Sequence, residues 1–72
     1  MHKLVYLPGS KRWHAYGDSY CCPIHRGDQI CIRVRDRYFP AVIELDRRWY
    51  LLISDTKFYL HPKQRYDVIL MF

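Results

Sequence analysis

Several features that define other protein classes are missing from this 72-residue sequence. No apolar run approaches the roughly 18 residues of a membrane-spanning helix. Pro8, Gly9, Lys11 and Arg12 interrupt the segment after the start, so we expect no signal peptide. The length allows one small domain with one core, which we place at residues 1–72. We therefore expect a soluble, cytoplasmic domain with no contact to a membrane.

Cysteine is scarce, and its arrangement excludes the common cysteine-based scaffolds. The residues present are Cys21, Cys22 and Cys31, an odd set with two adjacent members, unlike the disulfide framework of a secreted domain. Cys22 and His25 have a spacing that zinc ligands use, but the paired motifs of structural zinc sites are absent. We expect reduced thiols, no metal and no other cofactor, while a zinc-stabilised accessory domain stays open as a minor alternative.

A helical periodicity is also absent, and apolar residues recur at every second position instead. The clearest run is 29–35, where Ile30, Ile32 and Val34 alternate with Cys31 and arginines. The remaining strands or extended segments are expected at residues 3–7, 12–22, 38–45, 49–54, 57–60 and 66–72. The run 49–54 is apolar on both faces, which predicts the most buried strand. A single helical turn is expected at residues 61–64.

This pattern predicts an all-β fold. Short strands separated by regular turns are typical of a sandwich or a small barrel. The length favours an SH3-like barrel of five to six short antiparallel strands with one helical turn, because closure removes exposed sheet edges. The last strand should pair with the first ones, and Pro40 should lie at an edge or a bulge. The expected core includes Ile30, Ile32, Val34, Ala41, Ile43, Leu52, Val68 and Leu70.

Four short segments resemble a known family: Arg26-Gly27-Asp28, residues 29–32, residues 38–44 and Trp49-Tyr50-Leu51. This family of very short bacterial and phage proteins is catalogued only as a domain of unknown function. Its members share a G-D-x-I-x-V strand, a strand ending in an acidic residue and a W-Y-L segment. The resemblance covers about residues 17–72 and departs from the family pattern at two turns that usually carry glycine. It implies a compact β-barrel of phage or mobile-element origin in the cytoplasm of a bacterial host cell, and it brings no catalytic residue with it.

Positive charge is in excess, with 12 Lys and Arg against 7 Asp and Glu. A net charge of +5 attracts polyanions without specifying one. Arginine combined with aromatic side chains is typical of surfaces that bind phosphates and bases, and of protein–protein hot spots. The residues predicted to bind the partner are Arg33, Arg35, Arg37, Tyr38, Arg47 and Arg48. Their two turns should point to opposite ends of an antiparallel sheet, so the set does not automatically form one patch.

The sequence offers no persuasive catalytic group. Cys22 and His25 lack an evident pocket and oxyanion donors, and a domain this small rarely encloses a small-molecule substrate. We therefore expect no enzyme. The expected function is a binding module of phage or mobile-element origin that docks on nucleic acid or a nucleoprotein. The alternative is a phage-encoded inhibitor that binds a bacterial defence effector, as anti-CRISPR proteins do. The oligomeric state is left open.

Overall fold

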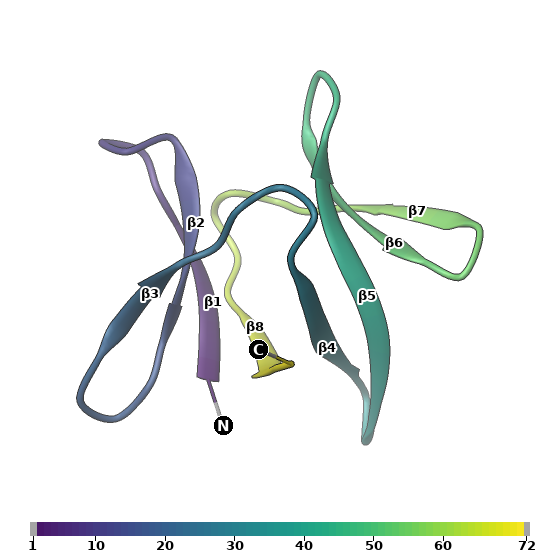
Figure 1. Cartoon of the computed structure of the whole chain (residues 1–72), viewed down its shortest axis with the longest axis horizontal. Coiled ribbons are helices and arrows are strands. Elements are labelled where there is room, and N and C mark those ends of the chain that lie inside the picture. The colour runs from purple at the N-terminus through teal and green to yellow at the C-terminus, as the bar shows by residue number, and fades with distance from the viewer. Residues whose placement is uncertain (1, 72) are drawn as a thin grey trace.

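The computed structural model describes residues 2–71, which form one antiparallel sheet of eight strands (Figure 1). The strands are β1 (His2–Leu7), β2 (Arg12–Tyr16), β3 (Cys21–Pro23), β4 (Gln29–Val34), β5 (Arg37–Leu45), β6 (Trp49–Ile53), β7 (Thr56–Tyr59) and β8 (Tyr66–Leu70). Their order in the sheet is β3-β2-β1-β8-β4-β5-β6-β7. The last strand thus pairs with β1 and β4, as the sequence predicted.

Alternation along the strands separates a buried face from an outer face. In β4, Ile30 and Ile32 are buried, while Cys31 and Arg33 lie on the outer face. Ile32 stands opposite Val68 of the central strand β8. The sheet is strongly twisted, so that β1–β3 and β5–β7 lie on either side of β8 and β4 (Figure 1). The core consists of Leu4, Trp13, Ala15, Ile24, Ile30, Ile32, Ala41, Ile43, Leu51, Leu60 and Val68.

The predicted core is confirmed except at two positions. Leu70 is half-buried against the core, but Val34 is 42% exposed and Leu52 is 36% exposed. Val34 lies beyond the part of β4 that pairs with β8, so that strand does not cover it. Leu52 stands opposite Val42 on the outer face. Strand β6 is therefore not the most buried strand, because Leu51 alone among its residues is fully buried.

The expected barrel of five to six strands is wrong in two respects: residues 2–71 form eight strands, and these do not close into a barrel. The segment 12–22 divides at a turn where Gly17 N–H donates to the Tyr20 carbonyl at 2.9 Å. The two outermost strands are short, three residues in β3 and four in β7. Short edge strands leave few backbone groups unpaired at the edges of the sheet. Barrel closure was expected to remove these exposed edges.

Proline and turn residues explain two local features. Pro40 lies in the first half of β5, which pairs with β4 but extends beyond the end of β6. This confirms the predicted edge position. The expected helical turn at 61–64 is a β-turn, closed by a bond of 2.9 Å from Gln64 N–H to the His61 carbonyl. Among the described residues, no helix is long and apolar enough to cross a membrane.

Candidate functional site

The structure divides the six predicted binding residues between the two ends of β5. Arg35 and Arg37 lie at the hairpin before this nine-residue strand, and Arg47 and Arg48 lie in the turn after it. A strand of this length spans about 30 Å, close to the longest dimension of the molecule, 32 Å. Figure 1 shows the two turns at opposite ends. The set is therefore not one patch, in agreement with antiparallel pairing.

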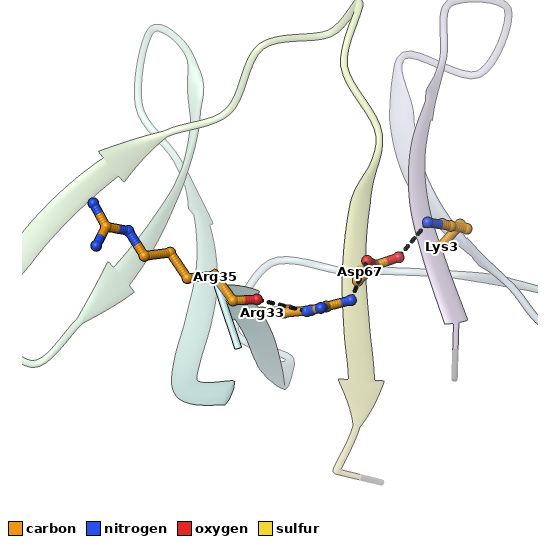
Figure 2. Close-up of polar contacts among 4 residues, drawn as sticks. All are labelled: Lys3, Arg33, Arg35 and Asp67. Atoms are coloured by element: carbon orange, nitrogen blue, oxygen red, sulfur yellow. Dashed lines mark hydrogen bonds and ion pairs between the residues drawn. The ribbon is translucent and has the colours of Figure 1, made fainter. Parts of the chain in front are cut away.

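Arg33 takes part in a polar network on the outer face. Its Nε–H donates to the Arg35 carbonyl at 2.6 Å, and its Nη1 lies 3.4 Å from Asp67 Oδ2. Lys3 reaches the same carboxylate from β1, and these two cations lower the pKa of Asp67, Lys3 having the larger effect. In Figure 2 Lys3 and Arg33 converge on Asp67 from either side of β8, while the Arg35 side chain points away. Arg33 thus links β4 to the central strand.

Tyr38 and Arg37 occupy the same hairpin with different exposure. Tyr38 stands opposite Arg33 and is half-buried. Its hydroxyl is buried and has no hydrogen-bond partner among the described residues. Arg37 is exposed at the first position of β5. Arg35 and Arg37 are therefore accessible to a partner at this hairpin, whereas the Tyr38 hydroxyl is not.

The turn after β5 is held by one carboxylate. Asp46 Oδ1 accepts a bond from Arg48 N–H at 2.9 Å, and Oδ2 accepts bonds of 3.1 Å from both Lys57 Nζ and Tyr59 Oη. The backbone bond from Arg48 is the main reason that the pKa of Asp46 is lowered to about 2. The Arg48 guanidinium lies over the Tyr59 ring, 4.8 Å from its centroid. Within residues 2–71, Arg47 forms no ion pair and is exposed.

Positive charge gathers where three connections of the chain meet. Residues of the connections 8–11 and 24–28 line one hollow together with Leu45 and Trp49, which flank the connection 46–48. With Arg12 at the start of β2, these three connections contain five cations and two acids. We call this region the basic end. Its cations are Lys11, Arg12, Arg26, Arg47 and Arg48.

The hollow at the basic end has a volume of about 410 Å³. Its lining consists of Lys11, Arg12, His25, Arg26, Leu45 and Trp49. Trp49 is half-buried and packs against the core. Arg26 Nε lies 3.9 Å from Glu44 Oε1, whereas neither Lys11 nor Arg12 forms an ion pair within residues 2–71. The lining therefore combines two apolar side chains, Leu45 and Trp49, which we call the floor, with three cations and His25, which we call the walls.

Backbone hydrogen bonds hold the walls of this hollow in place. Ile24 N–H donates to the Trp13 carbonyl at 2.9 Å, and Gly27 N–H donates to the Ile43 carbonyl at 2.8 Å. The connection between β3 and β4 is thus fastened to β2 on one side and to β5 on the other. His25 N–H also donates to Asp28 Oδ2 at 2.8 Å. These bonds place His25 and its neighbour Arg26 between two strands that are not adjacent in the sheet.

Sequence reasoning selected Arg47 and Arg48 but missed the polar residues that line the hollow. Lys11, Arg12, His25 and Arg26 belong to two segments that precede the predicted meander, and no motif joins them. No local signal could have found them, because β3 and β4 are not neighbours in the sheet and the connection between them crosses from β2 to β5.

The cysteines lie apart from the basic end. Cys31 Sγ is 3.4 Å from Met71 Sδ on the outer face, and the Cys22 thiol donates to the Pro23 carbonyl at 3.6 Å. The three thiols are free. Within the described part of the chain, no group of three or more His, Cys, Asp or Glu side chains is arranged to hold a metal ion.

The fold and this charge distribution define a small all-β domain built on one open antiparallel sheet. The chain belongs to the family described as Domain of unknown function (DUF5348), whose model matches residues 2–70. The resemblance to a domain of unknown function noted from the sequence is in line with this match. No curated protein matches the chain. No solved structure matches it either.

Proposed function

We propose that this protein is a non-enzymatic binding module that docks on nucleic acid, free or within a nucleoprotein, through its basic end. The observation that carries the proposal is the clustering of charge: the three connections that meet at the hollow, with Arg12, contain five cations and two acids. Such a local concentration of positive charge orients the molecule toward a polyanion.

The individual cations support this proposal. Lys11, Arg12 and Arg47 form no ion pair within residues 2–71, so a phosphate would not have to displace a carboxylate from them. Each cation that contacts a phosphate releases condensed counterions, which makes binding strong at low salt and weak at high salt. Arg48, held over Tyr59, keeps its charge close to an aromatic surface. This combination is suited to a nucleic-acid backbone.

Origin and finer fold relationship form part of the same proposal. A phage or mobile-element setting, and action in the bacterial cytoplasm, rest on the resemblance seen in the sequence. The order of β4, β5 and β6 as a meander, followed by short β7 and by β8 returning to β4, supports an SH3-like relationship.

The test compares two pairs of arginines that flank β5. Arg47→Ala/Arg48→Ala removes two charges from the basic end, and Arg35→Ala/Arg37→Ala removes two charges from the other end of β5. Binding of each protein to short single- and double-stranded DNA and RNA is titrated at low and moderate salt. We expect the first variant to bind more weakly, with a salt slope lower by about two, and the second to bind like the wild type.

The controls separate the possible failures. Arg33 is left unchanged because it holds Asp67, so its loss would mix stability with binding. Weaker binding by Arg35→Ala/Arg37→Ala alone would place the interface at the hairpin between β4 and β5. Both residues belong to the set that the sequence predicted to bind the partner. If the wild type binds no nucleic acid even at low salt, the proposal is wrong. An inhibitor that binds a bacterial defence protein is then the hypothesis to pursue.

A further inference from the structure

We infer that the hollow at the basic end accepts an unpaired nucleotide, so that the protein prefers single-stranded nucleic acid, with Trp49 as the surface on which a base stacks. This inference rests on the proposed function and deepens it. The observation behind it is the mixed chemistry of the hollow, whose floor is apolar and whose walls are cationic. A nucleotide has the same two parts, a flat apolar base and a charged phosphate.

The floor is built by a cross-strand pair. Leu45 of β5 stands directly opposite Trp49 of β6, and both line the hollow. Trp49 is half-buried against the core, and a backbone bond of 3.0 Å from Leu60 N–H to its carbonyl holds its segment in place. A ring fixed on one side by the core offers its remaining surface without a large entropy cost. Stacking of a base on such a ring is tolerant of sequence.

The walls come from two other segments. Lys11 ends the connection between β1 and β2 and Arg12 begins β2, while His25 and Arg26 belong to the anchored connection between β3 and β4. Arg26 has a long contact of 3.9 Å to Glu44, which an approaching phosphate can replace because both side chains are partly exposed. The phosphates on either side of a stacked base would therefore meet cations from both walls.

Geometry favours a single strand over a duplex. The apolar floor lies inside a hollow, and the bases of a duplex are already stacked on one another within the double helix. A duplex could contact the cations but could not place a base on Trp49 without unpairing it. A single strand can turn a base outward without breaking base pairs. Proteins that bind single strands with little sequence preference stack such bases on aromatic side chains. Inorganic phosphate could use the walls but not the floor.

The experiment follows intrinsic tryptophan fluorescence of the full chain during titration with oligothymidylate, with a mixed-sequence duplex and with inorganic phosphate. Trp13 is fully buried, so a change in emission on binding reports chiefly on Trp49. We expect quenching by oligothymidylate and tighter binding to it than to the duplex. Inorganic phosphate should cause little quenching.

Two substitutions at one position separate stacking from packing. Trp49→Phe keeps an aromatic ring and should bind oligothymidylate within a few-fold of the wild type, without the quenching. Trp49→Leu keeps an apolar side chain against the core and should lose about tenfold or more in single-strand affinity, with duplex affinity unchanged. Thermal unfolding of both variants checks that they fold. If Trp49→Leu does not fold, protection of wild-type Trp49 from iodide by bound oligothymidylate replaces it.

The outcomes distinguish this inference from the proposed function. Equal binding to single strand and duplex, with tryptophan emission unchanged, would overturn the inference and leave nucleic-acid binding through the basic end intact. The same conclusion follows if Trp49→Leu weakens both ligands equally or neither. Failure of every nucleic acid to bind at low salt would overturn both.

Discussion

The same residue type serves different purposes in this molecule according to its neighbours. Arg33 is tied to Asp67 and to a backbone carbonyl, whereas Arg47 forms no ion pair within the described residues. Two carboxylates organise these contacts. Asp67 joins side chains from β1 and β4, and Asp46 closes the turn that carries Arg47. A count of arginines therefore overestimates the surface that is free to meet a partner.

Asp46 gives a prediction about pH. Its pKa is about 2 in the folded chain and 3.8 ordinarily, so its carboxylate contributes stability that is complete above about pH 4 and is lost as the pH falls through about 2. Asp46→Asn should lower the free energy of unfolding at neutral pH, and the difference from wild type should shrink between these two pH values. Urea denaturation across this range measures it.

Asp55→Asn is the matched control, since Asp55 lies in the turn between β6 and β7 and forms no ion pair within residues 2–71. Its effect should be small at every pH. A difference between wild type and Asp46→Asn that stays constant down to pH 2 would show that the carboxylate acts through something other than its charge.

Among the strands, β8 has the decisive position, because it joins β1 to β4 and so connects the two parts of the sheet. Its alternation places Val68 in the core and Ile69 on the outer face. The neighbouring strand β4 does the same with Ile32 and Cys31. The contribution of a methyl group to the free energy of unfolding therefore depends on which face of these two central strands carries it.

Two identical substitutions test this difference between faces. Ile32 is 1% exposed and Ile69 is 43% exposed. Ile32→Val should cost about 0.5–1.5 kcal/mol of unfolding free energy because it leaves a small cavity. Ile69→Val should stay within about 0.5 kcal/mol, as surface changes usually do. Chemical denaturation of the two variants beside the wild type gives both values. Equal costs would mean that Ile69 is covered in solution, for example by a second molecule.

The molecule as a whole depends on contacts between the two ends of its sequence. Strand β1 begins at His2 and pairs with β8, which begins at Tyr66. The core likewise combines Leu4 and Trp13 with Leu60 and Val68. Contacts between residues far apart in sequence form late, because the intervening loop must close first. The sheet can therefore be completed only when the last strand is present.

Removal of residues 66–72 should consequently prevent folding, although the meander β4–β7 and the hairpin β1–β2 remain in the chain. We expect the truncated protein to lose cooperative thermal unfolding and the near-ultraviolet circular dichroism signal of Trp13. A synthetic peptide spanning residues 66–72, added at high concentration, tests whether the missing strand restores cooperative unfolding. A truncated chain that still unfolds cooperatively would show that one part of the sheet is stable alone.

Local pattern was sufficient for the strands and for most of the core. Alternation of apolar and polar residues identified β4 and β5 and the burial of Ile30, Ile32, Ala41 and Ile43, because a strand presents successive side chains to opposite faces. Proline chemistry placed Pro40 at an edge for a similarly local reason. The charge excess indicated a polyanion as the partner class, which stays a prediction.

Register and long-range pairing required the folded structure. Alternation says which residues share a face, but not where a neighbouring strand ends, so Val34 was expected to be buried and is exposed beyond the end of β8's pairing with β4. It also does not say whether the outermost strands meet, and here they do not. The hollow is the clearest case. Lys11, Arg26 and Trp49 lie far apart in sequence, and only the packing of three connections around one hollow brings them together.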